Sequence, residues 1–174
     1  MIELKTPRLL LRPLTPADEE TVHEYAGDRE NTQYMMYLPN ETRKETAAFL
    51  QRVAAEWQKD EPGFYEFAIV LNGAHIGAVS VALDKSRQKG TLGWIVCRKQ
   101  QGKGCATEAA KAVADFALRT LGVRKLVAYC DARNAASCRV MQKIGLTLER
   151  EDGTRRYRGS DEDVAELKYA MTVL

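Results

Sequence analysis

The segment Gln101-Gly102-Lys103-Gly104-Cys105-Ala106-Thr107 decides how the rest of this 174-residue chain is interpreted. Gly102 and Gly104 stand directly before residues with helical periodicity, so we expect a tight glycine turn that opens a helix. Bare backbone N–H groups at a helix N-terminus form a site for an anion such as a phosphate or pyrophosphate. The alternative is a glycine-rich surface turn with solvated lysines beside it.

The charges around this segment favour the anion site. The cations between residues 85 and 107 are Lys85, Arg87, Lys89, Arg98, Lys99 and Lys103, and no Asp or Glu lies among them. The P-loop pattern GxxxxGK[ST] is absent. A dinucleotide fold would use Gly102-x-Gly104 with Asp131 as its ribose acid, but Thr107 occupies the third glycine position and too few residues follow Asp131.

Periodicity on both sides of the glycine segment predicts an α/β domain. The expected strands are 8–14, 64–71, 75–83, 91–97, 125–130, 146–150 and 164–173, and the expected helices are 15–26, 42–59, 108–121 and 135–144. Asn72-Gly73 indicates a hairpin, whereas the strand–helix–strand unit around 91–130 requires a parallel pair. We therefore expect one domain over residues 1–174, with a mixed, mostly antiparallel sheet of about seven strands and about four helices.

Three other segments carry weaker signals. Residues 28–37 fit a short helix or a loop, and Tyr34-Met35-Met36-Tyr37 within them is either local core or the wall of a substrate cleft. Residues 152–160 are polar and read as a connection between strands. His75 is expected to be a surface residue of the hairpin turn.

Composition narrows the class of protein. The chain is 45% apolar and 29% charged, and its net charge of +2 is too small to indicate a nucleic-acid-binding protein. It has no apolar run of about 18 residues and no signal-peptide pattern, so we expect a cytoplasmic protein without a membrane partner. Because Cys97, Cys105, Cys130 and Cys138 form no CxxC pair, we expect reduced thiols, no metal and no disulfide framework.

Three blocks of the sequence resemble the GNAT N-acetyltransferases, and the resemblance covers the whole chain. Residues 101–106 fit the signature Q/R-x-x-G-x-G/A, and Thr6–Arg12 looks like the start of the RimJ/RimL-like subgroup, which acetylates the N-termini of ribosomal proteins. Asn134-Ala135-Ala136-Ser137, followed by residues 141–146, is similar to the segment N-x-x-S … K-x-G-F. The resemblance implies a sheet that splays between the strand before the glycine loop and the strand after its helix, opening a slot for acetyl-CoA.

The resemblance also implies contacts to acetyl-CoA. Backbone N–H groups of residues 102–107 would hold the pyrophosphate, and an N–H near Ile95 would polarise the thioester carbonyl. Asn134 would bind the pantetheine arm, although Asn is also a favoured helix N-cap, and Ser137 is the candidate acid near the cofactor sulfur. The implied cofactor-binding residues are Trp94, Ile95, Val96, Gln101, Gly102, Lys103, Gly104, Cys105, Ala106, Thr107, Asn134 and Ser137.

The general base cannot be assigned from the sequence. Relatives often carry a Glu near the start of the strand before the loop, but residues 89–93 here contain no carboxylate. Glu66 or an ordered-water relay could replace it. A covalent route through a cysteine is disfavoured, because no His lies near any of the four thiols in the sequence.

By resemblance, the chain transfers an acetyl group from acetyl-CoA to a primary amine. The subgroup favours a protein or peptide α-amine, and the alternative is a small-molecule amine such as a polyamine, an amino acid or an aminoglycoside. A non-catalytic acyl-CoA-binding module is an alternative of another class. A homodimer is an alternative that the sequence leaves open.

Overall fold

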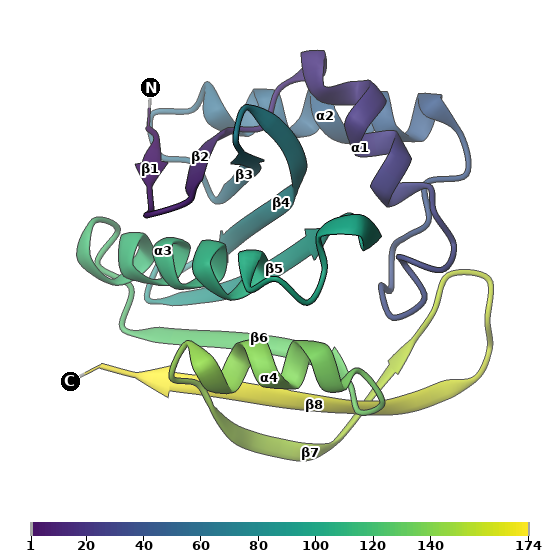
Figure 1. The fold of residues 1–174 in the computed structure, drawn as a ribbon. Helices are drawn as coiled ribbons and strands as arrows, with labels where there is room; N and C mark the ends of the chain where they lie inside the picture. The colour runs from purple at the N-terminus through teal and green to yellow at the C-terminus, as the bar shows by residue number, and fades with distance from the viewer. Residues whose placement is uncertain (1, 174) are drawn as a thin grey trace.

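An eight-stranded mixed sheet runs through the computed structural model, which describes residues 2–173 (Figure 1). The strands are β1 (Leu4–Lys5), β2 (Leu9–Pro13), β3 (Phe64–Leu71), β4 (Ala74–Leu83), β5 (Lys89–Val96), β6 (Lys125–Asp131), β7 (Thr147–Arg156) and β8 (Asp163–Thr172). The helices are α1 (Glu19–Ala26), α2 (Arg43–Trp57), α3 (Cys105–Arg119) and α4 (Ala135–Lys143). None of the described helices is long and apolar enough to cross a membrane.

The strands lie in the order β1-β2-β3-β4-β5-β6-β8-β7, and β5 and β6 form the one parallel pair of neighbours. That pair is short, because only residues 89–91 of β5 are in register with residues 125–127 of β6. Beyond Thr91 and Val127 the two strands separate. The predicted mixed, splayed sheet is therefore confirmed, with eight strands rather than about seven because the short edge strand β1 was not anticipated.

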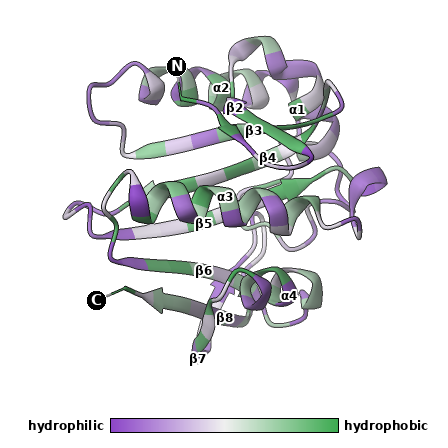
Figure 2. Cartoon of the chain, turned by 60° about the vertical axis from the view of Figure 1, so that its left-hand side comes forward, coloured by the Kyte–Doolittle hydropathy of each residue, from purple (hydrophilic) through white to green (hydrophobic). Residues whose placement is uncertain are grey.

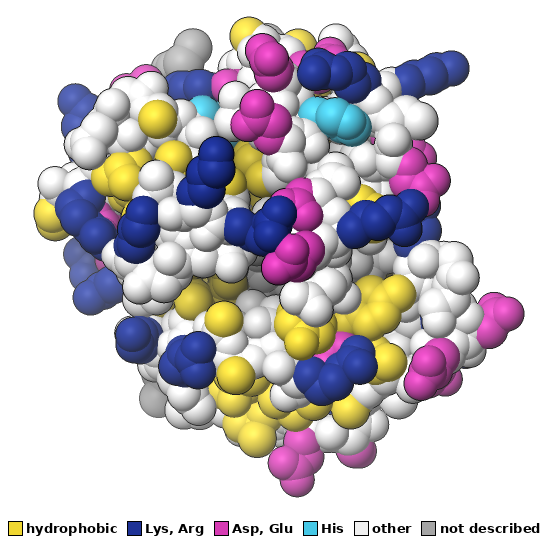
Figure 3. Space-filling model, turned by 45° about the vertical axis from the view of Figure 1, so that its right-hand side comes forward, with side chains coloured by type: hydrophobic (Ala, Val, Ile, Leu, Met, Phe, Trp, Pro, Cys, Tyr) yellow, Lys and Arg dark blue, Asp and Glu magenta, His cyan; other side chains and the backbone are white. Residues whose placement is uncertain are grey.

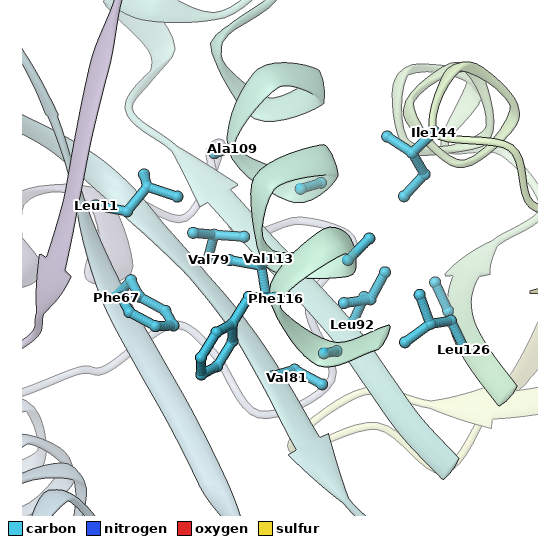
Figure 4. Close-up of a cluster of buried hydrophobic side chains, with 14 of the residues drawn as sticks. Leu11, Phe67, Val79, Val81, Leu92, Ala109, Val113, Phe116, Leu126 and Ile144 are labelled. Atoms are coloured by element: carbon cyan, nitrogen blue, oxygen red, sulfur yellow. The ribbon is translucent and has the colours of Figure 1, made fainter. Parts of the chain in front are cut away.

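Helices cover both faces of the sheet and bury its apolar side chains. On one face, α3 packs its apolar stripe of Ala109, Val113 and Phe116 against the strands, where Phe116 meets Phe67 edge to face (Figure 4). On the other face, residues of α1 and α2 such as Val22 and Leu50 form a second cluster. The hydropathy colouring shows polar outer surfaces on the helices over a more apolar sheet (Figure 2). Full burial of each large apolar side chain contributes about 1.5–3 kcal/mol.

Several local expectations are corrected by the structure. Helix α3 begins at Cys105, three residues before the predicted start, because Gly104 takes a left-handed conformation and acts as its N-cap. Strand β7 runs on to Arg156 through part of the expected connection, with register shifts that accommodate its polar residues. Of the two alternatives for residues 28–37, a short helix or a loop, the structure has the loop, which is built from turns. The prediction of His75 as a surface residue is wrong, since its side chain is 8% exposed and lies beside Asp18 and Tyr25.

A buried carboxyl lies on the face of the sheet that α1 and α2 cover. Glu66 of β3 is 8% exposed, on the same face as Ala68 of the second cluster. Burial raises the pKa of Glu66 to about 8, and a hydrogen bond with Ser80 offsets only part of this effect. The folded chain therefore keeps a proton on Glu66 over a pH range in which the unfolded chain releases it.

This proton makes stability depend on pH. Between the ordinary pKa of 4.5 and the raised value of about 8, the free energy of unfolding should fall as pH rises, because the folded state binds the extra proton. Glu66→Gln keeps the shape of the side chain but cannot ionise. We expect its melting temperature, relative to that of the unaltered chain, to be higher at about pH 9 than at about pH 5. Thermal unfolding followed by circular dichroism checks this, with the exposed Glu162→Gln as control. An equal pH dependence in both variants would contradict the assignment.

Candidate functional site

A cleft of about 570 Å³ lies where β5 and β6 separate. Its walls come from the loop after α1, from the end of β5 and the glycine loop, and from α4. Figure 3 shows a hollow across the middle of one face of the molecule, with apolar side chains gathered near it. The lining residues are Glu30, Asn31, Gln33, Tyr34, Met35, Trp94, Ile95, Val96, Arg98, Gln100, Gln101, Gly102, Gly104, Cys105, Ala106, Thr107, Asn134, Ala136, Ser137, Arg139, Val140 and Lys143.

The splay leaves peptide groups of β5 facing the cleft. Peptide groups alternate in direction along a strand, and the N–H of Cys97 points to β4, where it donates to Ile76 at 2.8 Å. By this alternation the peptide of Ile95 also faces β4, whereas those of Trp94 and Val96 face the gap. The N–H expected near Ile95 is thus supplied by a neighbouring residue.

The glycine loop is built from backbone that only glycine adopts readily. Gly102 has a φ of +73° and Gly104 a φ of +81°, both in the left-handed region. Together they turn the chain from β5 into the first turn of α3. The unpaired N–H groups of that turn and the positive end of the helix dipole face the cleft, which suits a pyrophosphate.

The N-terminal segment anchors this loop. Glu108, in the first turn of α3, accepts hydrogen bonds from Thr6 Oγ1 at 2.6 Å, the Arg8 backbone N–H at 3.0 Å and Arg8 Nε at 2.7 Å. Arg8 Nη1 also donates to the carbonyl of Lys103 at 2.9 Å. Arg8 therefore compensates the negative charge of Glu108 beside the anion site. Burial would raise the pKa of Glu108, but the bonds from Thr6 and Arg8 outweigh it and leave that pKa below its ordinary value.

The basic side chains of the loop are mostly engaged elsewhere. Arg98 donates to Asp28 at 2.7 Å and to Glu30 at 2.5 Å, which ties the loop after α1 to the glycine loop. Lys103 Nζ donates to the carbonyl of Lys99 at 2.8 Å and lies outside the cleft lining. We therefore expect the anion site to consist mainly of backbone N–H groups rather than of a cluster of lysine charges.

Asn134 and Ser137 enter the cleft from the start of α4. Asn134 is the N-cap, since its Oδ1 accepts from the Ser137 N–H at 3.1 Å, and its Nδ2 donates to Ser137 Oγ at 3.2 Å. Ser137 Oγ accepts in this bond, so its own hydrogen remains available to a group in the cleft. Both side chains can therefore serve the helix and a ligand together.

Comparison with known proteins identifies the family and the fold. A sequence profile of the acetyltransferase (GNAT) domain matches residues 8–147. The chain belongs to the GNAT acetyltransferase family. A GNAT acetyltransferase structure from Bacillus anthracis is 27% identical, with a TM-score of 0.84 and 98% of each chain covered. RimL, the ribosomal L7/L12 α-N-protein acetyltransferase solved in complex with coenzyme A, has a TM-score of 0.87 at 18% identity, over 99% of this chain and 98% of RimL.

Two curated GNAT relatives are similar over most of their length. The uncharacterised N-acetyltransferase YnaD of Bacillus subtilis is 27% identical over 152 residues, 85% of this chain and 84% of YnaD. Spermidine N(1)-acetyltransferase of Escherichia coli K12 is 25% identical over 142 residues, 81% of this chain and 74% of that enzyme. This GNAT chain is thus an N-acetyltransferase with acetyl-CoA as donor. The described residues contain no cluster of His, Cys, Asp or Glu that could hold a metal ion.

All but one of the predicted cofactor-binding residues line the cleft. The exception is Lys103, which lies outside the lining. The residues that line the cleft are Trp94–Val96, Gln101, Gly102, Gly104–Thr107, Asn134 and Ser137. The splayed strands and the left-handed glycines fit the pantetheine arm and the pyrophosphate of acetyl-CoA. The individual contacts of these residues with the cofactor stay predictions.

A general base is still not evident in the geometry. Glu30 is the one carboxylate among the described residues that line the cleft, and it is largely exposed and paired with Arg98. Glu66 lies away from the lining, on the α1 and α2 face. A water-mediated proton transfer remains the simplest route, because a primary ammonium in an open cleft can lose its proton to solvent.

Sequence reasoning missed a network at the end of β6. Asp131 accepts from Arg133 Nη2 at 2.7 Å and from the Tyr157 hydroxyl at 2.5 Å, and Arg155 Nη1 donates to the Tyr34 carbonyl at 3.1 Å. The bond from Arg133, more than any other contact, lowers the pKa of Asp131 to about 2. The network holds Tyr34 at the cleft wall, and only the folded chain brings its members together.

The backbone site predicts how acetyl-CoA binding responds to substitution. A Cβ at Gly104 would lie 3.3 Å from Arg8 Nη2, and a carboxylate there would repel the phosphates. We expect Gly104→Asp to nearly abolish acetyl-CoA binding while the fold survives. Lys103→Ala should cost at most about 1 kcal/mol, as for an exposed ion pair. Calorimetric titration of both folded variants measures this, and the reverse order of effects would contradict a backbone site.

Ser137 should act on turnover rather than on cofactor affinity. Its free hydrogen can be donated to the departing sulfur, an interaction made chiefly in the transition state. We expect Ser137→Ala to lower kcat by roughly tenfold or more and to change the KM for acetyl-CoA less. Steady-state thiol release measures both constants. A lowered melting temperature with unchanged kcat would leave Ser137 only its helix-capping role.

Proposed function

We propose that this N-acetyltransferase acetylates the α-amine of a peptide or protein N-terminus. The observation that carries the proposal is the charge of the cleft. Arg98, Arg139 and Lys143 line it, against the single carboxylate of Glu30, which Arg98 already neutralises. A polycation would meet net repulsion there, whereas an N-terminal amine brings one positive charge on an otherwise variable chain.

Some acidic residues outside the cleft are also paired with basic side chains. Asp18 pairs with Arg12 at 2.7 Å, and Asp163 pairs with Arg156 at 2.9 Å. Glu149 bonds both Lys125 and Lys168, and these two bonds, that of Lys125 most, lower its pKa to about 2. Pairing of these three carboxylates reduces the negative charge that could attract a cationic acceptor.

The acceptor side of the cleft suits an extended peptide. Tyr34 and Met35 supply an apolar wall, and the backbone of the adjacent segment is fixed because the Arg158 N–H donates to the Met36 carbonyl at 3.2 Å. Arg133 lies over the Tyr34 ring at 5.9 Å and restricts that side chain. An apolar wall that is held in place can receive the first side chain of a peptide.

The residues of the cleft support direct transfer. Acetyl-CoA supplies the activated acetyl group. Peptide N–H groups of β5 facing the gap would hold the carbonyl oxygen as negative charge develops, and Ser137 would return a proton to the leaving sulfur. The fold likeness to RimL is consistent with a peptide acceptor, and the sequence likeness to the spermidine enzyme favours a small polyamine as the second candidate.

Initial rates of thiol release separate the two acceptors. We expect peptides with a free N-terminus to exceed spermidine in kcat/KM by roughly tenfold or more, a difference of about 1.4 kcal/mol. The same peptides with a blocked N-terminus should be inactive, which excludes lysine acetylation. Glu30→Gln should raise the KM for spermidine only if a polyamine is the true acceptor. Spermidine turnover tenfold above every peptide would overturn the proposal.

A further inference from the structure

Two cysteines outside the described cleft lining face one another beneath α4. Cys130 near the end of β6 is 2% exposed, and Cys138 in α4 is partly exposed. Their Sγ atoms are 3.5 Å apart and both are free thiols. Residues 132–134 make the tight turn that folds α4 back onto β6. This turn brings the two thiols close together.

The distance is short enough for a covalent bond after small movements of the two residues toward one another. A disulfide joins its sulfur atoms at about 2.05 Å, so each Sγ would have to move by roughly 0.7 Å. The side chain of Cys130 points to the face of the sheet that α4 covers, as Leu126 and Ala128 of the same strand do. Cys138 approaches it from the underside of the helix.

The two thiols differ in access to an oxidant. Burial, followed by the neighbouring Cys138, raises the pKa of Cys130 to about 12, so Cys130 is not the first to react. Cys138 is the more exposed member, close to the start of its helix. This asymmetry matches an oxidisable thiol with a resolving thiol beside it.

We propose that Cys138 and Cys130 form a peroxide-sensitive dithiol whose closure weakens acetyl-CoA binding. Cys138 sulfur takes one oxygen from hydrogen peroxide to become a sulfenic acid, and one water is released. The sulfur of Cys130 then attacks the Cys138 sulfur and displaces the hydroxyl, which leaves with the Cys130 proton as a second water. Two thiols and one peroxide thus yield one disulfide and two waters.

Formation of this disulfide affects the cleft because Cys138 lies next to the residues that α4 contributes to the cleft lining. Cys138 directly follows Ser137, and its N–H donates to the Asn134 carbonyl at 3.2 Å. Drawing Cys138 toward β6 therefore moves the first turn of α4, where Asn134 and Ser137 enter the cleft. Displacements of about 1 Å at a binding site have large effects, and we expect a roughly tenfold rise in the Kd for acetyl-CoA.

Peroxide treatment of the full chain tests the proposal without any acceptor amine, so its outcome does not depend on the proposed function. The expected products are a loss in mass of two hydrogen atoms, a Cys130–Cys138 crosslinked peptide, and a weakened acetyl-CoA titration that dithiothreitol restores. Cys97→Ser keeps the pair and should behave like the unaltered chain. Cys138→Ser should keep its affinity after peroxide treatment.

The variant Cys130→Ser tests independently whether Cys138 is the first of the two thiols to be oxidised. Without its resolving partner, Cys138 should gain oxygen instead of forming an internal disulfide, and mass spectrometry would locate the added oxygen on Cys138. Oxidation of the other cysteines without a Cys130–Cys138 link would overturn the proposal. A complete link with unchanged affinity for acetyl-CoA would overturn its effect on the cleft.

Discussion

The structure depends on how briefly β5 and β6 pair. Three residues of each strand are in register, from Lys89 opposite Lys125 to Thr91 opposite Val127, and then the strands part. A continuous ladder would satisfy the peptide groups of β5 and close the sheet. Because it stops, peptide groups of β5 remain open along one edge, in an otherwise buried part of the sheet. A buried unpaired peptide group is costly, so the gap is suited to a ligand that can bond to it.

The elements on both sides of the gap between β5 and β6 are fixed in position by hydrogen bonds and ion pairs. On one side, Arg8 and Thr6 fix Glu108 and so set the first turn of α3. On the other side, Asp131 binds Arg133 just before α4, and Arg155 donates to the Tyr34 carbonyl in the cleft wall. These anchors come from segments far apart in the sequence. The cleft is therefore a product of the whole fold, although its chemistry resides in a short loop.

Many charged side chains of the molecule are paired with groups of opposite charge. Beside the glycine loop, Arg98 is bound to Asp28 and Lys103 to the carbonyl of Lys99. Several surface carboxylates, such as Asp18 and Glu149, are bound to Arg or Lys. We expect backbone dipoles, which have a fixed direction, to be the main contacts of the anionic cofactor. In the proposed function the amine is recognised by the shape of the cleft, and the excess of basic side chains there disfavours a polycation. This division matches an enzyme whose acyl donor is constant and whose acceptor varies among relatives.

The sequence by itself determined most of the helices and strands and the glycine turn that opens α3. Local signals sufficed where the cause is local: the capping boxes at Thr15 and Thr42, the Asn72-Gly73 turn, and the glycines before α3 all act within a few residues. The start of α3 was misplaced by three residues, because a left-handed Gly104 serving as N-cap gives no pattern of its own.

Only the tertiary structure decided which side chains meet. The tertiary structure brings together Tyr157 with Asp131 and Cys130 with Cys138, which no sequence periodicity relates. It also buries the side chain of His75 and places Lys103 outside the cleft lining. The choice between Trp94, Ile95 and Val96 as the source of the free peptide groups likewise required the register of β5 with β4. Long-range pairing sets these contacts, and the free energy that selects them is spread over the whole core rather than held in any one segment.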